Sequence, residues 1–151
     1  MKYIAQIKVV ATLFVLVFAF ASVGAEAADS GTQQSSEVRE KVVIQMSDSI
    51  PGKWNLALNN AKNIQEAIGK DKVEVEIVAY GPGIDMLKFE SEVGSRIDKA
   101  LADGVKVMAC ENTMRNMKLS KPDMLSSIGY VPSGVVEIMR KEKDGWSYIR
   151  P

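Results

Sequence analysis

The sequence contains no histidine, which removes a large group of catalytic and metal-binding possibilities. Without an imidazole, one subunit cannot carry a Ser-His-Asp or Cys-His catalytic arrangement, and it cannot form a histidine-ligated metal site. The single cysteine, Cys110, excludes an internal disulfide and a metal cluster held by several thiolates. Chemistry carried by this chain must therefore use one thiol, carboxylates, hydroxyl groups and backbone amides.

The chain also lacks an excess of charge of either sign. Its 151 residues include 19 Lys and Arg against 19 Asp and Glu, so the formal net charge is zero. Proteins that bind nucleic acid through its phosphates usually carry a clear basic excess. We therefore expect no nucleic-acid partner, and the chain length predicts one compact domain.

No apolar run has the roughly 20 residues that a membrane-spanning helix needs. Residues 9–20 form a shorter apolar segment, with lysines before it and small residues after it, which is typical of a secretory signal peptide. We predict a signal peptide over residues 1–27, with cleavage after either Ala25 or Ala27; an uncleaved anchor is the alternative. The mature protein is then expected to be periplasmic or secreted, without a membrane contact.

Residues 28–40 read ADSGTQQSSEVRE, a polar segment that is poor in large apolar side chains. Such a composition cannot bury enough apolar surface to fold alone, so we predict a flexible leader here. The folded domain is expected to span residues 41–151.

The domain alternates between short β-branched runs, typical of strands, and longer segments with helical spacing. Gly69 and Gly104 stand where helices would end. This alternation predicts an α/β fold, a mostly parallel sheet with helices on both faces. The expected strands are 41–46, 73–80, 105–110, a strand or loop at 127–131, and 146–149. The expected helices are 54–68, 93–101, a short turn from Cys110 through Met117, and 133–141.

Ligand sites of open parallel sheets lie outside the carboxyl ends of the strands, and Cys110 ends a predicted strand. Asn112 or Thr113 could cap a following helix whose first amide groups would point at the sulfur. A helix N-terminus favours the thiolate, which is the nucleophilic form of cysteine. The alternative is that Cys110 is a small buried side chain, as free cysteines often are.

Several other residues fall at the same predicted edge. Their hydroxyl or amide groups could position a small anion or a sulfur species, or they could serve only to cap helices. The candidate ligand-binding residues are Ser47, Asn112, Thr113, Ser133 and Gly134.

We expect neither a cofactor nor a metal ion. The segment 81–83, Gly-Pro-Gly, lacks the spacing of phosphate-binding loops, so it predicts a tight turn rather than a nucleotide or flavin site. Five methionines could bind a soft metal, but filling the core and subunit contacts is their commoner use. They are Met108, Met114, Met117, Met124 and Met139.

Five stretches of the domain form a combination that is more specific than any one of them. They are CENTM at 110–114, YVPSGVVE at 130–137, GWSYIRP at 145–151, WNLALNNAKN at 54–63 and YGPG at 80–83. Together they resemble the DsrE/DsrF-like family over residues 41–151. The resemblance implies a sheet of about five strands with flavodoxin-like layering, and assembly into homotrimers or homohexamers.

In the best understood relatives, a cysteine accepts sulfur as a persulfide and relays it to a partner, and Cys110 matches the position of that cysteine. The resemblance therefore implies an exported, sulfurtransferase-like protein with Cys110 as its catalytic residue and a sulfur donor or acceptor protein as partner. The alternative is a non-catalytic oligomeric module that binds a small ligand or a protein and has a structural cysteine. A flavodoxin-like nucleotide or flavin binder is the third hypothesis.

Overall fold

The computed structural model describes residues 39–151, and both the predicted signal peptide and nearly all of the predicted leader lie outside the described residues. The described strands are β1 (Glu40–Met46), β2 (Val73–Ala79), β3 (Lys106–Cys110), β4 (Gly129–Val131) and β5 (Ser147–Ile149). They form one sheet in the order β4-β3-β2-β1-β5, and every neighbouring pair is parallel. The predicted parallel α/β fold is confirmed.

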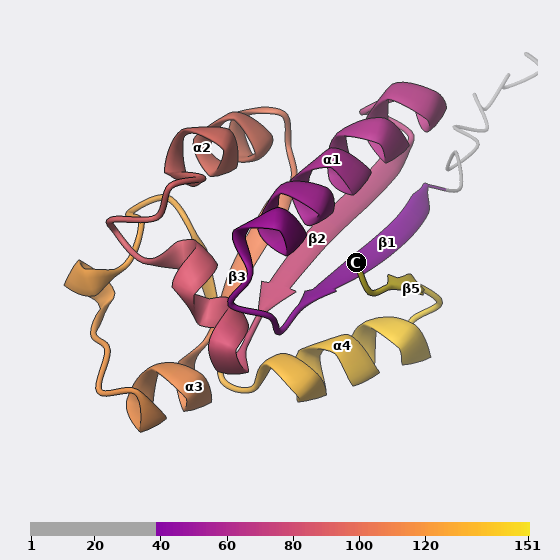
Figure 1. Cartoon of the computed structure of the whole chain (residues 1–151). Helices are drawn as coiled ribbons and strands as arrows, with labels where there is room; N and C mark the ends of the chain where they lie inside the picture. Colours follow the sequence, from indigo (N-terminus) through magenta and orange to yellow (C-terminus); the bar gives the residue numbers. More distant parts are fainter. Residues whose placement is uncertain (1–38) are drawn as a thin grey trace, which may run out of the picture. The chain divides into compact units, whose positions relative to one another are not determined.

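Helices cover both faces of this sheet, as Figure 1 shows. The described helices are α1 (Pro51–Ile68), α2 (Gly94–Ala102), α3 (Glu111–Asn116) and α4 (Gly134–Lys143), with 3-10 turns η1 (Gly81–Leu87) and η2 (Lys121–Asp123). α1 and α2 lie on one face and α4 on the other. The chain moves across the sheet in one direction from β1 to β4 and in the opposite direction from β4 to β5, and right-handed crossovers then place their helices on opposite faces. None of the described helices combines the length and hydrophobicity needed to cross a bilayer.

The local sequence explains where α1 begins and ends. Pro51 occupies its first position, where the missing N–H costs nothing. Trp54, Leu58 and Ala61 recur at helical spacing and are buried against the sheet. Gly69 ends the helix with a φ of 103°, a left-handed conformation that glycine adopts without the strain a side chain would add.

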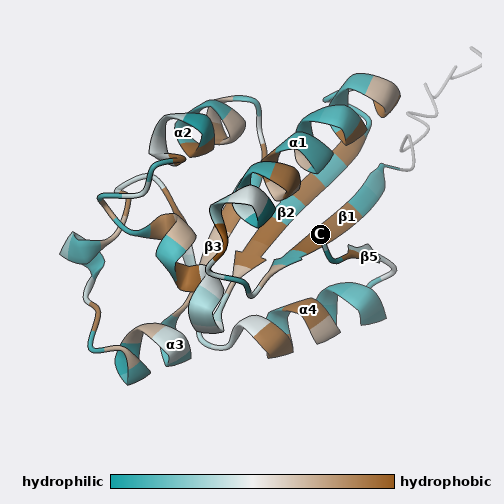
Figure 2. Cartoon of the chain, in the orientation of Figure 1, coloured by the Kyte–Doolittle hydropathy of each residue, from teal (hydrophilic) through white to brown (hydrophobic). Residues whose placement is uncertain are grey.

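β1 and β2 are buried along most of their length. Figure 2 shows hydrophobic residues in the middle of β1 and alternating with hydrophilic ones in β2. Ile44 pairs with Ile77 of β2 and belongs to the core beneath α1 and α2. Val43, its neighbour in sequence, points to the opposite face and packs in a second, smaller core with Ile138 of α4 and with Trp146. Neither Val43 nor Ile44 is exposed, as expected for central strands of a parallel sheet.

A buried ion pair fixes α4 to its face of the sheet. Glu76 of β2 is only 2% exposed, and its Oε2 lies 2.7 Å from Nζ of Lys141 on α4. The same ammonium group lies 4.0 Å from the centroid of the Trp146 ring, which gives a cation–π contact. The carboxylate thus ties the last turns of α4 to β2.

Candidate functional site

Cys110 is the last residue of β3 and directly precedes α3. It lies opposite Val131 of β4, in the layer of the sheet that faces α4. The residue is 4% exposed, so its thiol is almost completely covered. Cys110 therefore lies at the carboxyl edge of the sheet, as predicted, but its thiol is less accessible to solvent than that of a surface nucleophile.

Hydrogen-bond donors from two helix starts converge on the sulfur. The N–H of Gly134, the first residue of α4, donates to Sγ of Cys110 over 3.2 Å. From the first turn of α3, the Thr113 hydroxyl and the Thr113 N–H also stabilise the thiolate. The N–H of Asn112 contributes least, and it also donates to the carbonyl oxygen of Pro132 over 3.2 Å. The helix dipole of α4 adds positive potential at the same point. The sulfur therefore lies in an environment that favours negative charge.

These contacts outweigh the effect of burial on ionisation. Burial raises the pKa of the Cys110 thiol, because it removes water from the charged form. The hydrogen bond from the Thr113 hydroxyl and those from the backbone N–H groups of Gly134, Thr113 and Asn112 lower it by more. The net result is a pKa below the ordinary value, so the thiolate forms at a lower pH than in an unstructured chain.

The Thr113 hydroxyl is itself held in place by the loop after β2. The N–H of Gly81 donates to Oγ1 of Thr113 over 2.9 Å. Because this oxygen already accepts a hydrogen bond, its own proton is free to point at the sulfur. Gly81 has a φ of 51°, a conformation that suits glycine and aims its N–H at the threonine.

Gly134 approaches the sulfur closely because it has no side chain. A Cβ at this position would lie 3.0 Å from Cβ of Tyr80 and 3.3 Å from Cβ of Cys110. Both contacts are tighter than ordinary van der Waals packing, so a larger residue would push α4 away from the thiol. The pKa of Tyr80 is raised, mainly by burial, and its hydroxyl stays neutral beside the cysteine.

The sequence profile of the DsrE/DsrF-like family matches residues 40–151. The chain belongs to the DsrE/DsrF-like family. A search of curated proteins gave no match.

Solved structures with the same fold agree with this assignment. MTH1491 from Methanobacterium thermoautotrophicum, a protein of unknown function, is 31% identical, with a TM-score of 0.71 over 74% of this chain and 99% of its own. BT1422 from Bacteroides thetaiotaomicron is 15% identical, with a TM-score of 0.61 over 74% and 95%. The ychN protein from E. coli is 13% identical, with a TM-score of 0.58 over 74% and 99%. At such low identity the last two show the fold alone.

Within this DsrE/DsrF-like domain, the predicted site residues divide into two groups. Thr113 and Gly134 surround Cys110, as described above. The other three contribute little through their side chains. Asn112 is exposed and its Oδ1 accepts a hydrogen bond from Arg115 instead, so only its backbone serves the thiol. The Ser47 hydroxyl accepts a hydrogen bond from Gln45. Ser133 precedes α4 but makes no side-chain capping bond.

The expectation that Asn112 or Thr113 caps α3 is wrong. The helix begins at Glu111, directly after the strand, so Cys110 itself occupies the capping position. Asn112 and Thr113 therefore lie inside the first turn of α3. From there the hydroxyl of Thr113 acts on the sulfur of Cys110 instead of capping the helix.

The sequence did not indicate that two residues of this DsrE/DsrF-like site, Gly81 and Tyr80, act around the thiol. The YGPG stretch at 80–83 predicted only a tight turn. In the structure this segment begins the 3-10 turn η1, which extends to Leu87. What the pattern could not reveal is the long-range bond from Gly81 to Thr113, 32 positions later.

A shallow hollow lies on the α4 face of the sheet, with Tyr80 in its lining. It has a volume of about 210 Å³, and its lining includes Gln45, Tyr80, Val135, Met139 and Tyr148. Tyr148 donates a hydrogen bond to Oε1 of Gln45 across it. Tyr80 separates this hollow from the thiol, because its ring also contacts Gly134. Nowhere in residues 39–151 do three or more acidic or thiol side chains gather in a way that could hold a metal ion.

Replacing Thr113 by Val should raise the pKa of Cys110. Valine keeps the shape of threonine but removes the hydroxyl that stabilises the thiolate, so the thiolate should appear only at higher pH. A titration followed by the ultraviolet absorbance of the thiolate, with Cys110→Ser as blank, measures this shift. Ser133→Ala, which removes a hydroxyl without a capping bond, should leave the titration unchanged. Equal titration curves for Thr113→Val and the wild type would show that the hydroxyl does not act on the sulfur.

Proposed function

We propose that this DsrE/DsrF-like protein is an exported sulfur carrier that accepts a sulfane sulfur on Cys110 and passes it to an acceptor thiol. Family membership supports sulfur relay as the general function. The observation that carries the proposal is the hydrogen bond from the N–H of Gly134 to Sγ of Cys110 over 3.2 Å, together with the stabilisation of the thiolate by the Thr113 hydroxyl. Donors arranged in this way stabilise the Cys110 thiolate, which is the form that attacks the donor and the form that leaves when the sulfur is passed on.

The reaction needs only one nucleophilic sulfur in this chain. The Cys110 thiolate attacks the outer sulfur of a donor persulfide, R–S–SH; a new S–S bond forms to Cys110 and the bond within the donor breaks, releasing R–S⁻. In the second step an acceptor thiolate attacks the outer sulfur now carried by Cys110, and Cys110 leaves as the thiolate. Each step conserves electrons overall, so no separate oxidant, reductant, metal or cofactor is needed.

The test is intact-mass spectrometry of the protein under non-reducing conditions, before and after incubation with inorganic polysulfide. We expect the wild type to gain about 32 Da for each sulfur added and to lose this mass when a reductant is supplied. Cys110→Ser should gain nothing, because no other residue in the chain is a thiol. An equal gain in wild type and variant would exclude Cys110 as the acceptor.

A second function is favoured by one specific observation, the 4% exposure of Cys110. A thiol packed between the strand end and Gly134 could serve only to join β3 to α4, in a module that binds a small ligand or a protein. The same experiment separates the two functions when it is repeated in denaturant. Uptake of sulfur by the unfolded chain alone would assign Cys110 a structural role.

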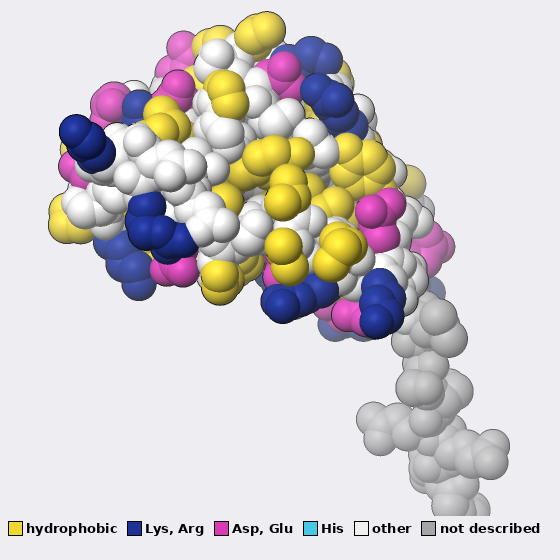
Figure 3. All heavy atoms as spheres, turned by 90° about the horizontal axis from the view of Figure 1, so that it is seen from below, with side chains coloured by type: hydrophobic (Ala, Val, Ile, Leu, Met, Phe, Trp, Pro, Cys, Tyr) yellow, Lys and Arg dark blue, Asp and Glu magenta, His cyan; other side chains and the backbone are white. Residues whose placement is uncertain are grey.

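The proposal includes self-association, as a homotrimer or homohexamer. Figure 3 shows the face that carries α4, where hydrophobic side chains gather near the middle and charged ones lie around them. Val135 and Met139 of α4 are 55% and 61% exposed, and Tyr148 of β5 adjoins them across the hollow. An apolar cluster with a charged surround is the kind of surface that copies of a protein bury on assembly. Location outside the cytoplasm rests on the signal-like sequence of residues 1–27.

A further inference from the structure

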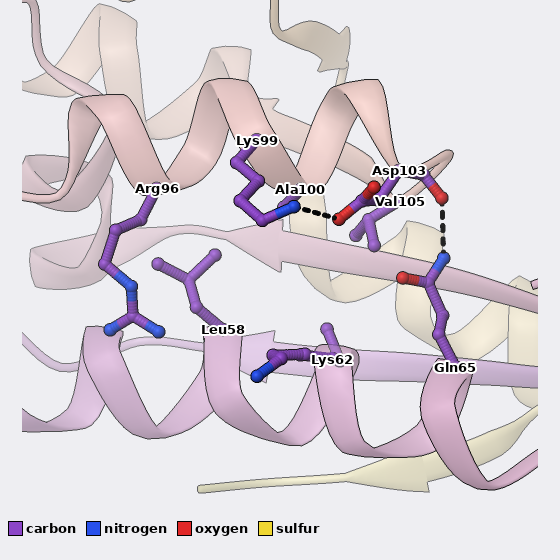
Figure 4. Close-up of a pocket in the computed structure, with 9 residues that line it drawn as sticks. Leu58, Lys62, Gln65, Arg96, Lys99, Ala100, Asp103 and Val105 are labelled. Carbon is purple, nitrogen blue, oxygen red and sulfur yellow. Dashed lines mark hydrogen bonds and ion pairs between the residues drawn. The ribbon is translucent and has the colours of Figure 1, made fainter.

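A second candidate site lies between α1 and α2, on the face of the sheet opposite α4 and away from Cys110. Figure 4 shows the residues that line it. Its floor is apolar and comes from both helices and the start of β3: Leu58, Ala61, Ala100 and Val105. The cavity measures about 70 Å³. A single water needs roughly 10–15 Å³ on the same measure, so the slot has room for on the order of five non-hydrogen atoms.

One end of the slot carries a guanidinium group that is held rigidly by neutral partners. Arg96 of α2 points toward α1, where its two terminal nitrogens donate to Oδ1 of Asn55 and, over 2.7 Å, to Oδ1 of Asn59. Asn55 is oriented in turn, because its Nδ2 donates to the carbonyl oxygen of Pro51 over 3.0 Å. Both asparagines belong to the WNLALNNAKN stretch of α1, and the proposed sulfur chemistry gives this stretch no role.

No acidic side chain among residues 39–151 neutralises the charge of Arg96, because none lies in ion-pair contact with it. A guanidinium has five N–H donors, so three of them are free of the two asparagines. A fixed cation with spare donors at the mouth of an apolar slot is suited to a planar carboxylate.

The opposite end of the slot does not compete for this charge. Asp103 is the acidic residue there, and both its oxygens are engaged: Oδ1 lies 2.6 Å from Lys70 and Oδ2 lies 3.0 Å from Lys99. Its backbone carbonyl accepts a hydrogen bond from Nε2 of Gln65 over 2.8 Å. Lys62 adds a further cation at the mouth, although it pairs with an exposed glutamate. The potential around the slot is therefore positive.

From this combination of shape and charge, we infer that the slot binds a short-chain aliphatic carboxylate. Its carboxylate pairs with Arg96, and three or so methylene or methyl groups lie on the floor formed by Leu58, Ala61 and Ala100. The size of the cavity excludes long fatty acids, and the apolar floor disfavours inorganic anions, which would leave it unfilled. This site is independent of the proposed sulfur chemistry.

The experiment is a titration of the ¹⁵N-labelled protein with sodium butyrate, followed by two-dimensional NMR at constant ionic strength. We expect saturable shifts centred on the amides of Leu58, Ala61, Ala100 and Val105, with a dissociation constant of about 1 mM, as is usual for a ligand of this size. 1-Butanol, which has the same chain without the charge, should bind at least tenfold more weakly.

Arg96→Gln provides the decisive variant, because the residue is only half-buried and its replacement should not disturb the fold. We expect butyrate to bind about tenfold more weakly to this variant. Arg140→Gln removes the same charge from the exposed surface of α4 and should change affinity less than twofold. The inference is overturned if butyrate gives no saturable shifts at the slot, if butanol binds equally well, or if the two variants behave alike.

Discussion

Gly83→Ala should lower the free energy of unfolding by about 3 kcal/mol. A Cβ at this position would lie 2.3 Å from the carbonyl oxygen of Met46, 2.6 Å from its carbonyl carbon and 2.9 Å from Cα of Ser47. All three atoms are backbone at the end of β1, so no side-chain rotation can relieve the overlap. Urea unfolding followed by circular dichroism measures the loss.

Gly52→Ala is the matched control for this substitution. Gly52 lies in the first turn of α1, and a Cβ there would meet no atom within 4 Å. Alanine should therefore stabilise the protein slightly, by up to about 1 kcal/mol, because it reduces the freedom of the unfolded chain. If Gly83→Ala is as stable as Gly52→Ala, the close approach of Gly83 to the end of β1 does not limit which residue this position accepts.

The effect of Gly83→Ala should also reach the thiol. Gly83 lies two residues after Gly81, whose N–H holds the hydroxyl of Thr113 beside Cys110. Displacing η1 from the end of β1 would lengthen this hydrogen bond. The stability of the β2 to η1 turn and the ionisation of the cysteine are therefore coupled through one backbone segment.

Lys141→Met should cost about 3 kcal/mol of stability, because it leaves the carboxylate of Glu76 buried without a cation. Glu76 is 2% exposed, and its Oε1 has no hydrogen-bond partner among the described residues, so Lys141 supplies the compensation for the charge. Methionine keeps most of the apolar stem of lysine over the Trp146 ring, so packing should change little. Chemical denaturation again provides the measurement.

Two further variants separate the charge from the packing. Lys62→Met breaks an exposed i,i+4 pair with Glu66 and should cost less than about 0.5 kcal/mol. The double variant Glu76→Leu with Lys141→Met removes both buried charges and should recover most of the lost stability. If the double variant is as unstable as Lys141→Met alone, the loss comes from packing and not from an uncompensated carboxylate.

The fold could be predicted from the sequence because its signals are local. Helical spacing of Trp54, Leu58 and Ala61 marked α1, and Gly69 marked its end at the residue where the structure has it. The short β-branched runs gave the strands to within one residue at most ends. The order β4-β3-β2-β1-β5 was beyond this reasoning, since pairing of β5 with β1 depends on contacts between residues about a hundred positions apart.

The candidate site was predicted in part, for the same reason. The position of Cys110 follows from the end of a strand, which is a local signal. The donors that act on its sulfur come from Gly134, which is 24 positions away, and from Thr113, whose hydroxyl depends on Gly81. Asn112 was expected to contribute its side chain, but Arg115 one turn later binds that amide. Such competition between polar partners is decided by side-chain geometry that the sequence does not display.

The brevity of the two outer strands limits how copies of this protein can join. β4 and β5 each have three residues, so each edge of the sheet offers little backbone for another chain to extend by strand addition. A continuous sheet running from one subunit into the next would gain few hydrogen bonds at such an edge. The proposed self-association is therefore expected to use side-chain faces such as that of α4 rather than strand addition.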